Sequence, residues 1–147
     1  NYCGQPWKTQ ELIRKHTRIN YRNTPDGVNG NDDCGQMSAW YLFSVMGFYP
    51  VCPGTDQYVL GAPYLPYLKL TLPDGKTLEI KAPGVSDKKR YVQSLKLNGK
   101  VYDKMYITHE DILKGGVLEF KMGASPNKRR GLSPEDKPYS LTNGINK

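Results

Sequence analysis

The sequence predicts an α+β fold in which two helices precede a β-rich segment. Apolar residues recur at helical spacing from Pro6 to Arg18. A second, almost wholly apolar run from Met37 to Met46 stands between an acidic loop and a glycine. After Pro53 and Gly54 the pattern changes to short β-prone runs separated by turn signals. These three observations indicate helices first and an antiparallel sheet after them.

The first helix is expected to be an ordinary amphipathic one. Pro6 suits the first helical turn, where its missing N–H costs nothing. Lys and Arg occupy the positions between the apolar ones, and the turn-forming residues Asn23–Gly27 end the helix. The residues that define its apolar face are Trp7, Leu12, Ile13, His16 and Ile19.

The second helix follows a pair of adjacent carboxylates. Asp33 and Gln36 have the spacing of a capping box, so we expect the helix to begin at Asp33. Gly47 supplies a left-handed C-terminal cap, and Pro50 prevents continuation of the helix. Apolar residues on most of its circumference indicate that other elements enclose it. Because Asp32 and Asp33 cannot both cap, one carboxylate is left free.

Short strands with turns between them make up the rest of the chain. Pro73–Lys76 and Asn98–Gly99 have the composition of hairpin turns. Thr108 and Asp111 resemble a further helix cap, and Gly115 ends what would be a very short helix. The predicted strands are Gln57–Leu60, Leu68–Leu72, Leu78–Lys81, Tyr91–Leu97, Val101–Ile107 and Val117–Met122.

Composition excludes several classes of function. The chain has 147 residues, 37% of them hydrophobic, which is enough for one core. No stretch approaches the ~20 apolar residues of a membrane helix, so we expect no membrane span. The net charge of +7 would permit binding to polyanions, but the basic runs Lys88–Arg90 and Lys128–Arg130 have no interleaved aromatic residues. We interpret them as solvated charge and expect no nucleic-acid partner.

Cysteine and histidine give little sign of a transition-metal site. Cys3, Cys34 and Cys52 lack the short paired spacings of zinc and redox sites, and they allow at most one internal disulfide. His16 and His109 are far apart, with no metal-ligand partner at a typical spacing. We expect a structural role for each histidine.

Two long blocks resemble glycoside hydrolase family 92. They are YCGQPWKTQ at Tyr2–Gln10 and GNDDCGQMSAWYLFSVMGFYPVCPG at Gly30–Gly54. The likeness continues through YVLGAPYL, LKLNGK and ITHEDILKGGVLEFKMGASPN, and so covers about Asn1 to Asn127. That family's catalytic domain is an (α/α)6 barrel accompanied by a β-sandwich domain, and twelve barrel helices of ~11 residues with their connections exceed the present length.

The resemblance therefore implies a C-terminal piece of a longer enzyme. Residues 1–50 would hold the terminal helices and acidic loop of the barrel. Residues 51–127 would form a β-rich closing segment, and residues 128–147 an extended tail. The partners implied are the rest of the parent chain and mannose-containing glycans, and the location implied is secreted, periplasmic or at the cell surface. We expect the piece alone to be inactive.

The family implies a calcium-dependent, inverting exo-α-mannosidase, often with α-1,2 specificity. Its general base belongs to the acidic loop, which makes Asp33 the first candidate and Asp32 the second. A carboxylate at a helix start is favoured as the anion and so can accept a proton at neutral pH. The family's general acid, a Glu, and its calcium-binding Asn-Glu-Pro block would lie upstream of Asn1. Asp32 is the candidate calcium ligand in this chain.

Candidate mannose contacts are Trp7, Lys8, Thr9 and Asn31. A Trp can stack on a sugar face, although a Trp on an amphipathic helix is also a common core residue. A different class of function is open as well, because the chain is rich in strands and contains no general acid that we can identify. In that alternative the chain is a non-catalytic carbohydrate-binding or structural module.

Overall fold

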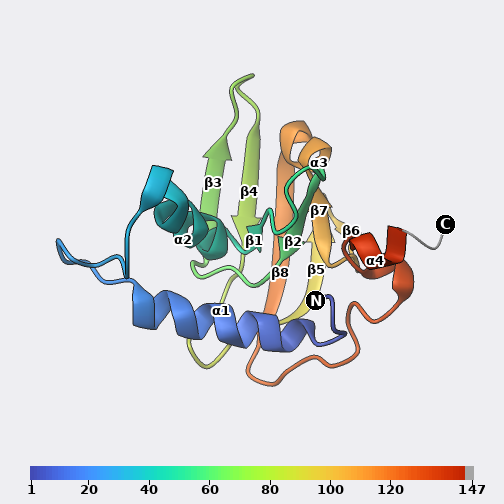
Figure 1. The fold of residues 1–147 in the computed structure, drawn as a ribbon. Helices are drawn as coiled ribbons and strands as arrows, with labels where there is room; N and C mark the ends of the chain where they lie inside the picture. Colours follow the sequence, from blue (N-terminus) through green and yellow to red (C-terminus); the bar gives the residue numbers. More distant parts are fainter. Residues whose placement is uncertain (145–147) are drawn as a thin grey trace.

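The computed structural model describes residues 1–144 and confirms the α+β class. Helix α1 lies along one side of the molecule, and the strands of the larger sheet stand across it (Figure 1). No helix in residues 1–144 is long and apolar enough to cross a membrane. In chain order the elements are α1 (Pro6–Asn20), the 3₁₀ turn η1 (Asp33–Gly35), α2 (Gln36–Met46), β1 (Phe48–Tyr49), β2 (Gln57–Leu60), β3 (Tyr67–Thr71), β4 (Thr77–Lys81), β5 (Tyr91–Leu97), β6 (Lys100–Val101), β7 (Tyr106–Thr108), α3 (His109–Lys114), β8 (Gly116–Gly123), η2 (Pro134–Asp136) and α4 (Leu141–Gly144).

The strands form two sheets. β1, β2 and β7 make an antiparallel sheet, whereas β3, β4, β8, β5 and β6 lie side by side in that order in a larger one. β4 and β8 run parallel and pair Ile80 with Leu118, so the expectation of a wholly antiparallel sheet is wrong at this pair. The single strand expected at Val101–Ile107 is also wrong, because β6 and β7 belong to different sheets.

One hydrophobic core joins the two sheets. Leu78 and Ile80 on β4, Leu118 on β8 and Ile107 on β7 have no exposed surface. Leu78 and Ile80 alternate with the half-buried Glu79, as expected for a strand with one face in the core. Full burial of a Leu or Ile side chain contributes about 1.5–3 kcal/mol each, so this cluster holds the sheets together.

Helix α1 contradicts the amphipathic interpretation in one respect. Its range is confirmed, although it ends at Asn20 rather than Arg18. Part of the expected apolar face points outward, because Leu12 is 50% exposed and Ile19 is 59% exposed, whereas Trp7 and Ile13 are partly buried. The face that packs on the rest of the chain is largely polar, and its buried residues are Pro6, Gln10, Arg14 and Thr17.

Buried hydrogen bonds attach this polar face. The Oε1 atom of Gln10 accepts from the backbone N–H of Val92 at 3.0 Å. Arg14 donates from Nη2 to the carbonyl of Pro63 at 3.0 Å, and its guanidinium lies 4.1 Å from the ring centroid of Tyr64. Buried polar groups stabilise a fold when they are paired in this way. Helix α1 is thus fixed in large part by directional bonds, and its apolar residues Leu12 and Ile19 stay exposed.

Helix α2 ends as predicted but is not enclosed. Gly47 has a φ of 97°, and its N–H donates to the carbonyl oxygens of Phe43 at 3.0 Å and Ser44 at 3.1 Å. Only Ser44 and Val45 are buried within the helix, and Leu42 is 60% exposed. The enclosure inferred from its apolar circumference is therefore wrong for the described part of this chain.

Helix α3 has the predicted capping box. Thr108 Oγ1 accepts from the N–H of Asp111 at 3.1 Å, and the Asp111 carboxylate accepts from the N–H of Thr108 at 3.2 Å. We expect Thr108→Ala to lower the free energy of unfolding by about 0.5–2 kcal/mol in urea titrations. Thr71→Ala, at an exposed edge-strand position, is the control and should change it by less than about 0.5 kcal/mol. Equal effects of the two changes would refute a stabilising role for the cap.

Within residues 128–144 the C-terminal segment is only partly the extended tail that composition suggests, and the last three residues of the predicted tail lie outside the described residues. Most of it is irregular, but Arg130 is buried, with Nη2 bonds to the carbonyls of Tyr102 at 2.8 Å and Lys104 at 3.3 Å. The carbonyl of Asp136 accepts from the backbone N–H of Met105 at 2.7 Å. Burial lowers the pKa of Arg130 to about 10, which nearby carboxylates partly offset. The interpretation of Arg130 as solvated charge is wrong, since it ties this segment to the β6–β7 connection.

Candidate active site

The connection from α1 to α2 is closed by a tight loop. Tyr21 and Val28 form an isolated antiparallel bridge, and the N–H of Arg22 donates to the carbonyl of Gly27 at 2.8 Å. Only glycine fits at position 27, because a Cβ there would lie 1.8 Å from the carbonyl oxygen of Arg22. This loop returns the chain to the end of α1 and sets the starting point of the acidic segment that follows.

The capping box expected at the start of α2 is wrong. Asp33 begins the turn η1, Cys34 has a φ of 54° and Gly35 a φ of 76°, and α2 begins only at Gln36. Two residues in the left-handed region redirect the chain, so that Asp33 cannot reach the amides of the first helical turn. The side chain of Gln36 donates to the hydroxyl of Tyr49 at 2.8 Å instead of returning to the cap.

Asp32 makes the contacts that were expected of Asp33. One carboxylate oxygen accepts from the backbone N–H of Ser38 at 2.9 Å, and the other accepts from the hydroxyl of Ser38. These hydrogen bonds, that of the hydroxyl first and that of the amide second, lower the pKa of Asp32. Asp33 is exposed and has no side-chain hydrogen bond within residues 1–144. One carboxylate is thus engaged and the other is free, and the free one is Asp33.

Asp32 should make the stability of the chain depend on pH in acid. Its pKa is lower in the folded state than the ordinary value of 3.8, so its stabilising contribution is present above that value and is lost as pH falls further. We expect Asp32→Asn to show a smaller loss of unfolding free energy on acidification than the unmodified chain. Urea titrations at several acidic pH values measure this. Identical pH profiles for the two proteins would contradict the assignment of Asp32 to the start of α2.

Aromatic side chains pack beside the acidic segment. The hydroxyl of Tyr21 donates to the carbonyl of Met37 at 2.9 Å, and its ring stacks on Trp40 with centroids 5.7 Å apart. Burial, and secondarily the charge of Asp32, raise the pKa of Tyr21. A shallow cavity of about 500 Å³ lies here, lined by residues that include Tyr21, Ser38 and Tyr41. Sequence reasoning placed Gly27 in a turn but missed its close approach to Arg22, and it missed Ser38 altogether, because these roles depend on contacts with residues five or six positions away.

The structure does not bring all the predicted sugar contacts together. Asn31 is exposed in the acidic segment beside Asp32 and Asp33. Trp7, Lys8 and Thr9 lie in the first turn of α1, whereas the acidic segment follows its last turn (Figure 1). A helix of 15 residues is roughly 22 Å long at ~1.5 Å per residue, so the two groups lie at opposite ends of α1.

The side chains at the start of α1 already have neighbours within the chain. The ammonium groups of Lys8 and Lys128 lie 5.4 Å and 5.3 Å from the ring centroid of Trp7. Thr9 Oγ1 accepts from the backbone nitrogen of Asn1 at 3.1 Å. Sugar contacts of Trp7, Lys8 and Thr9 stay a prediction, and these interactions give each of the three a neighbour within the chain as well.

Residues 1–144 contain no cluster of three or more His, Cys, Asp or Glu side chains that could hold an ion. Calcium takes six to eight oxygen ligands, so a calcium ion at Asp32 would need oxygen ligands beyond such side chains. The Nδ1 atom of His109 and the hydroxyl of Tyr58 form a hydrogen bond of 3.1 Å, which gives His109 a structural role. The three cysteines are free thiols.

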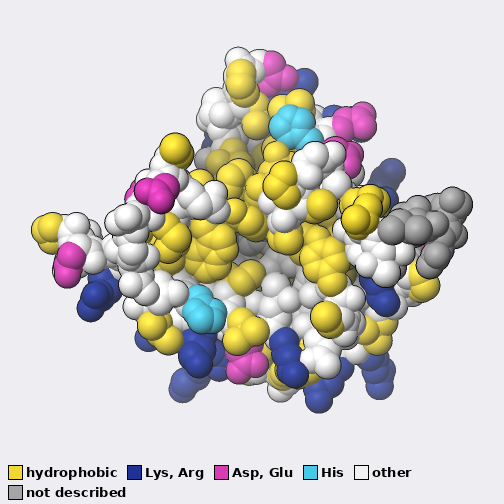
Figure 2. All heavy atoms as spheres, in the orientation of Figure 1, with side chains coloured by type: hydrophobic (Ala, Val, Ile, Leu, Met, Phe, Trp, Pro, Cys, Tyr) yellow, Lys and Arg dark blue, Asp and Glu magenta, His cyan; other side chains and the backbone are white. Residues whose placement is uncertain are grey.

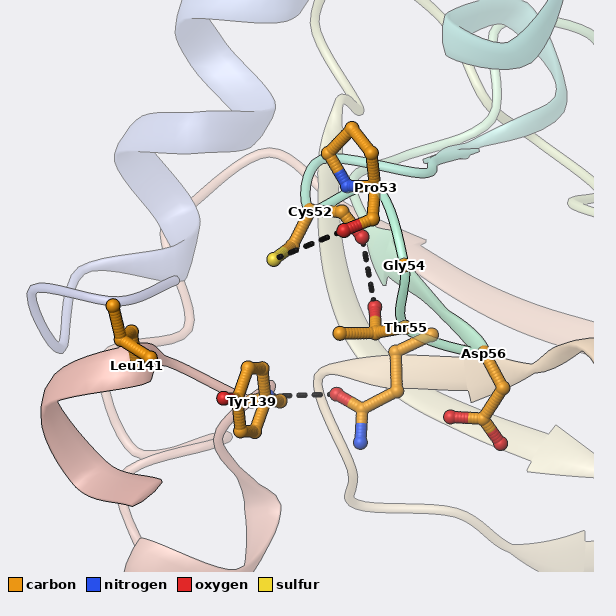
Figure 3. A pocket seen from close by; sticks show the side chains of 8 residues that line it. Cys52, Pro53, Gly54, Thr55, Asp56, Tyr139 and Leu141 are labelled. Carbon is orange, nitrogen blue, oxygen red and sulfur yellow. Dashed lines mark hydrogen bonds between the residues drawn. The ribbon is translucent and has the colours of Figure 1, made fainter. Parts of the chain in front are cut away.

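A second pocket lies between the β1–β2 connection and the C-terminal segment (Figure 3). Its volume is about 600 Å³, and Tyr139 closes one side by donating its N–H to the side chain of Gln57 at 2.7 Å. Asp56 is the single carboxylate in its lining. Hydrolysis of a glycoside uses two carboxyl groups, so this pocket fits that chemistry less well than the acidic segment does.

Comparison with known proteins identifies the family. The sequence profile of the glycosyl hydrolase family 92 catalytic domain matches residues 1–124. The structure of the family GH92 α-mannosidase BT3965 from Bacteroides thetaiotaomicron, also solved in complex with mannoimidazole, is 46% identical, with a TM-score of 0.91 over 96% of this chain. The inverting mannosidase BT2199 from the same organism is 42% identical, with a TM-score of 0.89 over 96% of this chain.

A curated relative from Arthroderma benhamiae, named an uncharacterized secreted glycosidase, is 34% identical over 99% of this chain. The chain spans about a fifth of each of these relatives, since it covers 19% of their length. The matched residues include helices α1, α2 and α3, both sheets and the acidic segment. The chain therefore belongs to glycosyl hydrolase family 92.

Proposed function

We propose that the protein to which this chain belongs is an inverting exo-α-mannosidase in which Asp33 is the general base. The observation that carries the proposal is that only one of the two adjacent carboxylates is held by hydrogen bonds. Asp32 is held by the amide and hydroxyl of Ser38, while Asp33 is exposed and has no side-chain hydrogen bond within residues 1–144. Relatives named as α-mannosidases, one of them as inverting, support the substrate and the stereochemistry.

In this mechanism Asp33 removes a proton from a water molecule as that water attacks the anomeric carbon. A second carboxyl group protonates the departing oxygen from the opposite face of the sugar, at ~6.5–9.5 Å from the base so that the water fits between them. Asp33 suits the base role because no hydrogen bond within the described chain competes for its oxygens. Asp32 anchors the segment on α2 and so positions Asp33.

The second carboxyl group is expected to come from the remainder of the parent protein. Leu12 and Ile19 on α1 and Leu42 on α2 are half or more exposed, and apolar side chains gather above α1 and beside α2 (Figure 2). Contiguous apolar surface of this kind usually marks an interface. We propose that the rest of the catalytic domain covers this face and completes the site, and that the isolated chain is therefore inactive.

Three finer properties belong to the same proposal. Specificity for α-1,2 linkages follows from the family resemblance. So does calcium dependence, in which Asp32 would supply one oxygen ligand and the parent protein the others. An extracellular or periplasmic location agrees with the secreted relative. Chelation should remove activity from the full-length protein, and added calcium should restore it.

Hydrolysis of an aryl α-mannoside by the full-length protein, followed by NMR, tests the function. The first product should be β-mannose, and the isolated 147-residue chain should give none. The α-anomer as first product would contradict inversion, and turnover by the isolated chain would contradict its dependence on the parent. Titration of the isolated chain with mannose addresses the alternative of a sugar-binding module, which predicts saturable binding without calcium.

A further inference from the structure

The acidic segment contains an Asn-Gly pair whose environment differs from that of a second such pair. Of the three Asn-Gly pairs in the sequence, Asn29–Gly30 precedes Asp32 and Asp33, Asn98–Gly99 joins β5 to β6, and Asn143–Gly144 ends α4. An asparagine followed by glycine is open to intramolecular attack, because glycine has no side chain to shield its backbone nitrogen. Asn29–Gly30 and Asn98–Gly99 therefore share the same intrinsic chemistry, and the fold alone distinguishes them.

The described part of the chain restrains the reacting groups of Asn29–Gly30 little. Both residues are exposed, and a Cβ added to Gly30 would meet no atom within 4 Å. The backbone N–H of Asn29 donates to the carbonyl of Asn20 at 3.2 Å, but in residues 1–144 neither the Asn29 side chain nor the Gly30 N–H has a hydrogen-bond partner. The two groups that would react are thus free to approach each other.

The fold restrains Asn98–Gly99. Asn98 has a φ of 51° and Gly99 a φ of 79°, as in a type I′ hairpin turn. The side-chain Oδ1 of Asn98 accepts from the backbone N–H of Val117 at 2.8 Å, and its backbone N–H donates to the carbonyl of Val117 at 2.9 Å. Its amide group packs against Gly116, where a Cβ would lie 2.0 Å from Oδ1. Attack by the Gly99 nitrogen would require breaking these contacts.

We propose that Asn29 is a site of spontaneous deamidation and that Asn98 is protected. The nitrogen of Gly30 bonds to the side-chain carbonyl carbon of Asn29, the bond from that carbon to the amide nitrogen breaks, and ammonia leaves with the proton from Gly30. Water then opens the resulting succinimide at either carbonyl and leaves aspartate or isoaspartate at position 29. Either product adds a negative charge to the acidic segment, and isoaspartate also adds a methylene group to its main chain.

Peptide mapping by mass spectrometry tests the site in the full-length protein incubated in mildly alkaline buffer. Loss of the amide at Asn29 should be faster than at Asn98 by at least an order of magnitude, and methylation by an isoaspartyl methyltransferase should label the Asn29 peptide. Asn29→Gln should remove this labelling. In a sample unfolded in urea the two asparagines should react at similar rates, because the protection of Asn98 comes from the fold.

Equal rates at the two positions in the folded protein would overturn the proposal. So would an intact Asn29 in the folded protein under conditions in which the urea sample reacts at both positions. Peptide mapping detects only the chemical modification of asparagine. Its result therefore does not depend on whether the protein is a mannosidase. Only an effect of this deamidation on catalysis by Asp33 would rest on the proposed function.

Discussion

Replacing Asp33 by Asn in the full-length protein should lower kcat for an α-mannoside by about 10²–10⁴-fold, with a much smaller change in KM. The amide has the size of the carboxylate but cannot accept the proton of the attacking water. Binding of the ground state should survive, because the proton moves only in the transition state. Steady-state kinetics with an aryl α-mannoside measure both parameters, and circular dichroism checks that the variant is folded.

Two matched variants separate the base from its neighbours. Glu135→Gln removes an exposed carboxylate outside this connection and should leave kcat within a factor of about two, as expected for a surface change away from special features. Asp32→Asn weakens the contact with Ser38 and should lower kcat less than Asp33→Asn does, because Asp32 affects the reaction only by positioning Asp33. If Asp32→Asn abolished turnover while Asp33→Asn retained it, the roles of the two carboxylates would be reversed.

Gly27→Ala should lower kcat by roughly 10²-fold while the chain stays folded, because misplacement of a catalytic group by ~1 Å has an effect of this size. The added Cβ would lie 1.8 Å from the carbonyl of Arg22, so the loop between Tyr21 and Val28 must open. That loop determines where the acidic segment begins, and its displacement would move Asp33. Kinetics with the same mannoside, beside a urea titration, measure the effect on activity and on stability.

Gly123→Ala is the control for this change. Gly27 and Gly123 both have φ values outside the left-handed region, so neither substitution is opposed by backbone strain of that kind. A Cβ at position 123 would meet the side chain of Gln93 at 2.6 Å, and that flexible side chain can move away. We expect near-normal kcat for Gly123→Ala. Near-normal kcat for Gly27→Ala as well would show that the loop does not position Asp33.

Local sequence signals predicted the elements whose boundaries are set by local chemistry. β2 at Gln57–Leu60 and β5 at Tyr91–Leu97 were predicted with their observed bounds. The left-handed cap at Gly47 and the capping box at Thr108 were also predicted, because each depends on residues within one helical turn. The parallel pairing of β4 with β8 was not predictable in this way, since strands distant in the chain meet there.

The start of α2 shows how a short motif can mislead. Asp33 and Gln36 have the right types and spacing, yet the left-handed conformation of Cys34 takes Asp33 out of reach. Residues other than glycine rarely adopt a left-handed conformation, so residue propensities would not predict it for Cys34. The resulting contact spans from Asp32 to Ser38, which is longer than the spacing that a capping box describes. The sequence indicated that one carboxylate is free, and the fold decided which.

Burial was the other property that the sequence did not reveal. Leu12 and Ile19 on α1 are exposed while Arg14 is 5% exposed, because the helix meets the sheets through directional bonds to backbone groups. Arg130 belongs to a basic run that resembles solvated charge, yet its guanidinium meets carbonyls more than 25 positions away. Charge and hydropathy patterns predict average environments, and they cannot identify a backbone partner that folding brings from elsewhere in the chain.

Azide with an Asp33→Ala variant of the full-length protein tests the role of Asp33 as base most directly. Azide carries no proton that must be removed, so it can attack the anomeric carbon without a general base, and the smaller side chain leaves space for it. We predict that azide restores turnover of an aryl α-mannoside and that NMR identifies the product as β-mannosyl azide. Hydrolysis by Asp33→Ala at the unmodified rate, with no dependence on azide, would contradict the account.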